Sequence, residues 1–128
     1  MVDPLVEAAR EAQRHAYAPY SKYAVGAALE ADDGRIFTGS NVENASYGLT
    51  NCAERTALFT ATSVGVRRFR RVLIVSNSEP PAPPCGACRQ VLAEFGLDLV
   101  VRSVGPRTER QWTLRELLPD AFTPELLA

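Results

Sequence analysis

The stretch Val72-Leu73-Ile74-Val75-Ser76 is a continuous apolar run that ends in a single serine. A run without polar residues at alternate positions predicts a strand that is buried on both faces of a sheet. The prolines of residues 80–84 (PPAPP) then prevent regular structure. Residues 85–95 form the next predicted helix, which ends at Gly96. A buried strand that leads through a loop into a helix is typical of α/β folds.

Upstream of this unit, the chain predicts a helix and two strands. Asp3 and Pro4 favour a helix start, and the helix is expected to end near Tyr17. Residues 25–29 and 35–38 are predicted strands, joined through the tight turn Asp33-Gly34 into an antiparallel pair.

Three further elements complete the prediction. A helix follows Asn51, which we expect to cap it, with Glu54 completing a capping box. Residues 97–104 form a predicted strand, and residues 113–116 (TLRE) form a second capping box for a short helix that ends at Pro119. This order predicts one α/β domain over residues 1–128, with a mixed sheet and helices against its faces.

Composition excludes several classes of partner. The 128 residues, 46% of them hydrophobic, suffice for one compact domain. With 14 basic and 15 acidic residues the formal net charge is −1, which argues against nucleic acid or an anionic membrane as partners and favours a small neutral molecule. The chain shows neither a signal-peptide pattern nor a run of about 18 apolar residues. We therefore expect a cytoplasmic protein.

The three cysteines of the chain fall in two short blocks, Asn51-Cys52-Ala53-Glu54 and Pro84-Cys85-Gly86-Ala87-Cys88. An odd number of cysteines in a reducing compartment favours metal binding or catalysis over a disulfide framework. Three thiolates are one ligand fewer than a closed tetrahedral zinc site needs. The pattern predicts one Zn²⁺ per chain, bound by Cys52, Cys85 and Cys88, with a fourth position open to water.

Two charged residues beside Cys52 suit this chemistry. Glu54 can reach a water molecule in the open position and is predicted to move protons between that water and a substrate. Three thiolates bring more negative charge than a divalent ion neutralises, and helix N-termini at both cysteine blocks reduce that surplus only in part. Arg55 and Arg89 directly follow the two cysteine blocks and could hydrogen-bond the sulfurs and reduce the surplus further, and we favour Arg55 for this role.

The cysteine blocks belong to a wider pattern. Four blocks carry it: PYSKYAVGAA at residues 19–28, GSNVENASY at 39–47, PCGACRQ at 84–90 and LLPDAF at 117–122. With Cys52-Ala53-Glu54 they resemble the zinc-dependent cytidine deaminases over nearly the whole chain. The resemblance implies a three-layer α-β-α sandwich around a mixed sheet of about five strands. It also implies hydrolytic deamination of cytidine and 2′-deoxycytidine to the uracil nucleoside and ammonia, in pyrimidine salvage.

The resemblance also implies roles for particular residues. Asn41 and Glu43 would hydrogen-bond the ribose hydroxyls, and Tyr23 and Ala53 would contact the nucleoside. The small three-cysteine members form homotetramers with active sites shared between subunits, so Phe122 would close over the base in a neighbouring subunit. Tyr23 stands where the family usually has phenylalanine.

Several alternatives stay open at this point. His15, the single histidine, would make the zinc site structural if it were the fourth ligand. Cys85 and Cys88 alone could form a thiol redox pair. A zinc-stabilised interaction module and a deaminase of another aminopyrimidine nucleoside would both keep the cysteine blocks. The basic run at 67–71 (RRFRR) is more typical of a solvated strand edge than of a nucleic-acid site.

Overall fold

The apolar run of the sequence lies in β3 (Phe69–Val75), the central strand of a five-stranded mixed sheet with the order β2-β1-β3-β4-β5. The computed structural model describes residues 3–127. Its other elements, in chain order, are α1 (Pro4–Arg14), β1 (Gly26–Ala31), β2 (Ile36–Ser40), η1 (Tyr47–Leu49), α2 (Ala53–Ser63), α3 (Gly86–Ala93), β4 (Val100–Val104), β5 (Glu109–Thr113), α4 (Leu114–Leu117) and η2 (Pro124–Leu127).

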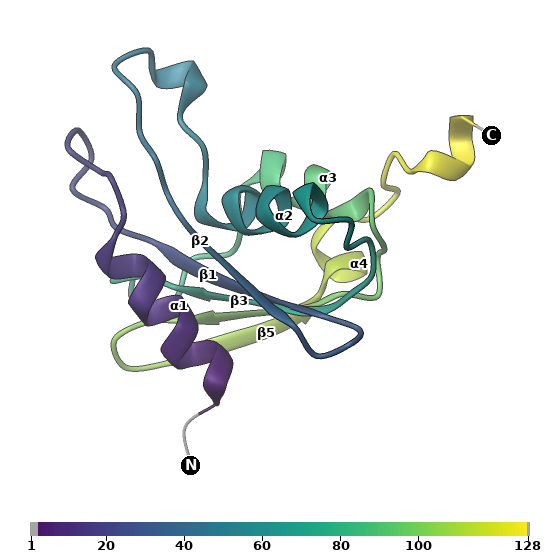
Figure 1. Cartoon of the computed structure of the whole chain (residues 1–128), viewed down its shortest axis with the longest axis horizontal. Coiled ribbons are helices and arrows are strands. Elements are labelled where there is room, and N and C mark those ends of the chain that lie inside the picture. The colour runs from purple at the N-terminus through teal and green to yellow at the C-terminus, as the bar shows by residue number, and fades with distance from the viewer. Residues whose placement is uncertain (1–2, 128) are drawn as a thin grey trace.

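Alternate residues of β3 pack into two separate hydrophobic cores. On one face of the sheet, Leu73 and Val75 pack with Leu5 and Ala9 of α1. On the other face, Val72 and Ile74 belong to a larger core that also contains buried residues of α2, α3 and α4, among them Ala57, Leu58, Leu92 and Leu114. Figure 1 shows α1 on one side of the sheet and α2, α3 and α4 on the other. The expected three-layer sandwich is therefore confirmed.

The strand pairing follows the prediction where the sequence pattern was strong. β1 and β2 are antiparallel, and Gly34 in their turn has a φ of 92°, which glycine adopts without steric cost. β3 and β4 are parallel, with α3 in the connection between them. β5 pairs antiparallel with β4, and the sequence pattern does not predict this strand. Its sequence, ERQWT, is mostly polar, and its first three residues are exposed at the edge of the sheet.

Several predicted boundaries need correction. α1 ends at Arg14 rather than near Tyr17. The N-cap of α2 is Cys52, so the capping box predicted for Asn51 and Glu54 is wrong. Asn51 instead pairs with Val42 through backbone hydrogen bonds in both directions, 2.9 Å each. The second capping box, between Thr113 and Glu116, is confirmed.

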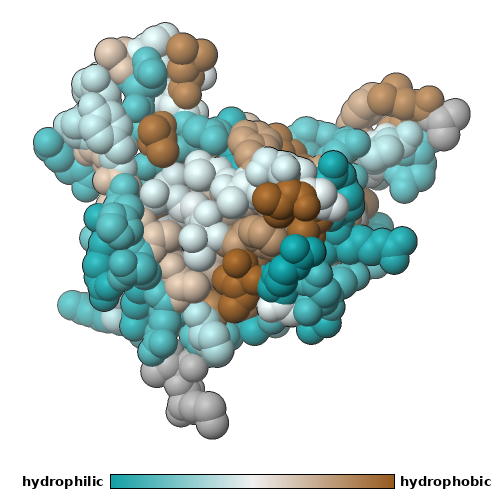
Figure 2. Space-filling view, viewed as in Figure 1, coloured by the Kyte–Doolittle hydropathy of each residue, from teal (hydrophilic) through white to brown (hydrophobic). Residues whose placement is uncertain are grey.

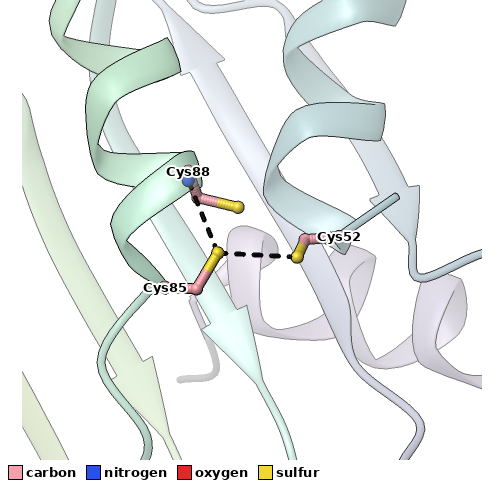
Figure 3. A group of neighbouring side chains, drawn as sticks. All are labelled: Cys52, Cys85 and Cys88. Atoms are coloured by element: carbon pink, nitrogen blue, oxygen red, sulfur yellow. Dashed lines mark hydrogen bonds between the residues drawn. The ribbon is translucent and has the colours of Figure 1, made fainter. Parts of the chain in front are cut away.

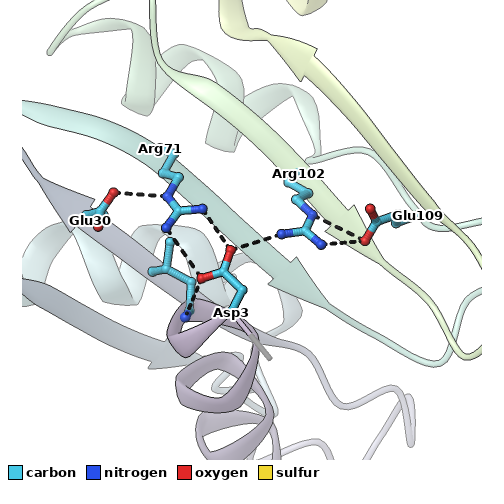
Figure 4. A network of polar contacts seen from close by, with 6 residues as sticks. Asp3, Glu30, Arg71, Arg102 and Glu109 are labelled. Carbon is cyan, nitrogen blue, oxygen red and sulfur yellow. Dashed lines mark hydrogen bonds and ion pairs between the residues drawn. The ribbon is translucent and has the colours of Figure 1, made fainter. Parts of the chain in front are cut away.

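A charged network fastens the start of α1 to the sheet (Figure 4). Asp3 caps the helix by accepting a hydrogen bond from the backbone N–H of Leu5 at 3.0 Å. Its Oδ2 also lies 2.8 Å from Nη1 of Arg71 on β3 and 3.0 Å from Nη1 of Arg102 on β4. Arg71 of the basic run thus pairs within the chain, as it also does with Glu30.

Gly39 on β2 allows α2 to lie directly on the sheet. A Cβ atom at this position would lie 2.4 Å from the backbone N of Ala57 and 2.6 Å from the carbonyl O of Ala53. Because real Cβ atoms do not approach other atoms so closely, this contact requires glycine. The contact places the first turn of α2, and with it Cys52, over the sheet.

Two segments project from the body of the molecule. Figure 1 shows the loop around η1 extending from one end and the C-terminal segment with η2 from the other, and Figure 2 shows apolar groups on both projections. Tyr47, Leu49, Leu126 and Leu127 are each more than 60% exposed. Among the helices of residues 3–127, none has the length and apolar character that crossing a membrane requires.

Candidate active site

Two helix N-termini bring the three cysteines together. Cys52 is the N-cap of α2, and Cys85 is the N-cap of α3, with Cys88 one turn further along α3. Their sulfur atoms all lie within 4.8 Å of one another (Figure 3). The positive end of each helix dipole thus points at the cluster and favours thiolates.

The sulfur positions fit a zinc ion. Sγ of Cys52 lies 3.7 Å from Sγ of Cys85. Zn–S bonds of about 2.3 Å at tetrahedral angles place two sulfurs about 3.8 Å apart. Cys52, Cys85 and Cys88 could therefore serve as three ligands with little rearrangement. His15 does not belong to this group, because it lies on the exposed surface and contacts Glu11 at 3.2 Å.

The electrostatics of the cluster favour a thiolate at Cys52 and a protonated thiol at Cys88. The pKa of Cys52 is lowered, first by the Cys88 thiol beside it and then by Arg55, against the effect of burial. The pKa of Cys88 is raised by its interaction with Cys52 and by burial. Nη2 of Arg55 lies 3.2 Å from Sγ of Cys52, in the position expected of a residue that offsets thiolate charge. A cation that binds all three sulfurs would therefore displace protons.

Glu54 is the buried acid beside this cluster. Its side chain is only 5% exposed, and burial raises its pKa to about 7, with the charge of Cys52 contributing. A carboxyl group with a pKa near neutrality can both release and accept a proton at physiological pH. Glu54 also helps line a cavity together with Cys52 and Cys85.

This cavity has a volume of about 210 Å³. Its walls combine apolar groups with a few polar ones, as small-molecule sites commonly do. Besides Cys52, Glu54 and Cys85, the lining residues are Ser21, Tyr23, Val25, Asn41, Glu43, Thr50, Ile74, Ser76, Ala82 and Pro83. The cavity thus joins the cysteine cluster to the segments expected to contact a nucleoside.

Asn41 and Glu43 line the cavity but also hold its walls in place. Asn41 is 8% exposed; its Oδ1 accepts from the backbone N–H of Val25 at 2.9 Å, and its Nδ2 donates to the carbonyl of Tyr23 at 2.8 Å. Glu43 accepts backbone hydrogen bonds from Tyr20 and Ser21. Both side chains therefore position the segment that carries Tyr23.

Of the other three residues predicted to contact the substrate, only Tyr23 lines the cavity. Ala53 is fully buried at the first position of α2, and Phe122 is 57% exposed; neither lines the cavity of this chain. The carbonyl of Phe122 accepts a 2.8 Å hydrogen bond from Nε2 of Gln90 on α3, which attaches the C-terminal segment to the helix of the second cysteine block.

Some residues of the cavity wall were not predicted from the sequence. Ser21 and Thr50 provide hydroxyl groups, and Ala82 and Pro83 of the proline-rich loop provide apolar surface. That loop is held by the fully buried Ser103 of β4, whose Oγ donates to the carbonyl of Ala82 at 2.7 Å. Proline-rich composition predicted stiffness here but gave no signal for a cavity wall.

A three-layer α/β fold that gathers three cysteines, two of them lining a cavity together with a buried glutamic acid, defines the class of the zinc-dependent deaminases. The model of the cytidine and deoxycytidylate deaminase zinc-binding region matches residues 2–104. This chain belongs to the cytidine and deoxycytidylate deaminase family.

Individual relatives agree over almost the whole length. A cytidine deaminase of Sporosarcina psychrophila is 47% identical over 130 aligned residues, covering 99% of this chain and 95% of the relative. One of Halalkalibacterium halodurans is 50% identical, covering 94% and 93%. The crystal structure of cytidine deaminase from Burkholderia pseudomallei has a TM-score of 0.91 at 50% identity, covering 95% of this chain and 100% of that one.

Proposed function

We propose that this protein hydrolyses cytidine and 2′-deoxycytidine to the corresponding uracil nucleoside and ammonia, as a step of pyrimidine salvage. One observation carries the proposal: the buried residue Glu54 lines the same cavity as Cys52 and Cys85. The walls of this cavity combine apolar groups for a base with polar groups for a sugar. The names of the relatives support the same substrate class.

We propose one Zn²⁺ per chain, held by Cys52, Cys85 and Cys88. When bound, the ion supplies Lewis acidity that makes water a nucleophile at neutral pH. Arg55 reduces the negative charge on the Cys52 sulfur through its hydrogen bond. The two helix N-termini act in the same direction.

Glu54 moves the protons of the reaction. Its carboxylate takes a proton from the attacking water and delivers it to N3 of the pyrimidine while oxygen adds to C4. It then takes the remaining proton from the new C4 hydroxyl and passes it to the exocyclic nitrogen, so that the C4–N4 bond breaks, the C4 carbonyl forms and ammonia departs with the electron pair. A pKa near 7 suits both directions of transfer, because neither the acid nor the base form is scarce at neutral pH.

The sugar and base are held by the other walls. Asn41 and Glu43 offer an amide and a carboxylate to the ribose hydroxyls, and Tyr23 offers a ring to the nucleoside. The backbone at Ala53, beside Cys52, is proposed to contact the base. Because three reduced cysteines are needed for the ion site, we place the protein in the reducing cytoplasm.

We further propose a homotetramer in which neighbouring subunits complete each site. Exposed apolar side chains on the two projecting segments support association, and Phe122 on one of them stays outside the cavity of its own chain. Light scattering together with the activity of Phe122→Ala tests this. A fully active monomer would contradict it.

The function is tested by following ultraviolet absorbance of the zinc-loaded protein with cytidine, 2′-deoxycytidine and cytosine. We expect loss of the amino group from both nucleosides and little reaction with cytosine, which lacks the sugar. Release of ammonia from neither nucleoside would refute the proposed substrate class.

A further inference from the structure

The Glu43 carboxylate is held by a single short turn. Its Oε1 accepts hydrogen bonds from the backbone N–H groups of Tyr20, at 2.9 Å, and Ser21, at 3.1 Å. The Ser21 hydroxyl donates to the other oxygen, Oε2. Three donors from two adjacent residues thus fix the orientation of one carboxylate.

The same hydroxyl is connected to a second cavity residue. Oγ of Ser21 accepts a hydrogen bond from the backbone N–H of Tyr23 at 3.0 Å. Between them, Lys22 has a φ of 60°, a left-handed conformation that non-glycine residues seldom adopt. The Ser21 hydroxyl therefore bridges Glu43 and Tyr23 across a turn whose backbone is under strain.

One acceptor site of the Glu43 carboxylate remains available to a ligand. A carboxylate offers about four lone-pair sites, and this turn occupies three of them. Both sites of Oε1 are taken by the backbone, so the open site belongs to Oε2, the oxygen that Ser21 also contacts. Ser21 and Glu43 both line the cavity.

We propose that Ser21 is a positioning residue for sugar recognition: its hydroxyl orients Glu43 so that Oε2 accepts a hydrogen bond from one sugar hydroxyl of the substrate. The proposal rests on the nucleoside substrate proposed above. It deepens that function by assigning a role to a side chain that would not itself take part in the chemical step.

The charge state of Glu43 supports this arrangement. Of the influences on the pKa of its carboxyl group, the hydrogen bond from Ser21 is the largest, and it lowers this pKa by more than burial raises it. An ionised carboxylate accepts hydrogen bonds only, which suits a sugar hydroxyl donor. Loss of the hydroxyl at position 21 would leave Glu43 with only the two backbone donors on Oε1 and would remove the donor that Ser21 directs at Oε2.

The test compares Ser21→Ala with Ser21→Thr in the zinc-loaded protein. The substrates are cytidine and 2′,3′-dideoxycytidine, which lacks both ring hydroxyls. For Ser21→Ala we expect KM for cytidine to rise about tenfold with kcat changed less than threefold, since about one hydrogen bond is lost. KM for the dideoxy substrate should change less than twofold, and Ser21→Thr should restore the cytidine value.

Binding measured without turnover gives an independent result. Calorimetry with uridine and 2′,3′-dideoxyuridine should show that Ser21→Ala weakens the first and leaves the second unchanged. In a Glu43→Ala background, Ser21→Ala should have no further effect on uridine affinity. Ser63→Ala serves as the matched control, because the Ser63 hydroxyl donates to the carbonyl of Thr60 within α2.

Equal losses for both nucleosides would reduce Ser21 to a structural turn residue and overturn the proposal. Unchanged KM and affinity in Ser21→Ala would overturn it as well. A wild-type protein that binds uridine with the expected dependence on Ser21 but deaminates nothing would refute the proposed reaction and leave the positioning role standing.

Discussion

The guanidinium of Arg55 donates a hydrogen bond from Nη2 to the Sγ of Cys52, the N-cap of α2 three residues earlier, at 3.2 Å. Each group stabilises the charged form of the other: the contact raises the pKa of Arg55 and contributes to lowering that of Cys52. The cluster therefore contains a built-in positive charge beside three sulfurs.

Replacing this charge should weaken catalysis while leaving the metal in place. For Arg55→Gln we expect kcat to fall about ten- to a hundredfold, because the sulfurs then donate more negative charge to the ion. Zinc content, measured by atomic absorption at saturating zinc, should stay near one per chain. Arg68→Gln, which removes an exposed arginine outside the cavity, is the control. Unchanged kcat in Arg55→Gln would contradict the role.

Glu54→Gln should preserve the fold and the metal while abolishing most turnover. The amide keeps the size of the buried side chain but cannot carry protons, so we expect kcat to fall by at least about a hundredfold. Steady-state kinetics and zinc analysis are the measurements. Glu94→Gln changes an exposed glutamate at the end of α3 and should leave kcat within about twofold. Near-normal activity of Glu54→Gln would exclude Glu54 as the proton carrier.

Zinc removal should lower both activity and stability. Because the ion binds the folded cluster preferentially, a thousandfold excess of free zinc over its Kd would stabilise the fold by about 4 kcal/mol. Chelation should therefore lower Tm in differential scanning calorimetry, and added Zn²⁺ should restore Tm and activity together. Mg²⁺ should restore neither, since it avoids thiolate ligands. A chelated protein with unchanged Tm would argue against a metal at Cys52, Cys85 and Cys88.

Gly39→Ala should disturb the site by displacing α2, the helix that Cys52 caps. The new Cβ would overlap the backbone of Ala57 and Ala53, so the helix must move away from β2. We expect a loss of about 1–3 kcal/mol in the free energy of unfolding and weaker zinc binding. Denaturant unfolding and competitive zinc titration measure the two effects. Gly48→Ala is the matched control, because a Cβ there meets nothing within 4 Å.

The Asp3 network predicts acid sensitivity of the fold. Burial raises the pKa of Asp3, but the hydrogen bond from Leu5 and the charges of Arg71 and Arg102 outweigh it, and the net pKa lies below 3.8. A lowered folded-state pKa contributes stability above the unfolded pKa, and this is lost as pH falls through the folded value.

Asp3→Asn removes the charge while asparagine still caps the helix. We expect a loss of about 1–2 kcal/mol at pH 7, because the carboxylate is partly buried against two arginines. The difference from wild type should shrink as pH drops below about 4. Urea unfolding at several pH values measures it, with the exposed Asp33→Asn as control. A pH-independent difference would show that the ion pairs contribute nothing.

Local sequence was informative where each residue's role depends on its neighbours along the chain. The apolar run at 72–75 predicted a strand buried on both faces, and residues 33–34 predicted the tight turn of a hairpin. The cysteine blocks and the surrounding motifs predicted which side chains would gather. The edge strand β5 was missed because its exposed residues carry no apolar pattern.

Spacing along the chain determined the composition of the site: three thiols, one acid and one arginine at two helix starts. Only the tertiary structure decided that Sγ of Cys52 lies 3.7 Å from Sγ of Cys85, that Glu54 is buried beside them, and that Ser21 holds Glu43. The reason is physical. Distances between residues far apart in sequence depend on how helices pack on the sheet, as at Gly39, and packing is a property of the whole fold rather than of any one segment.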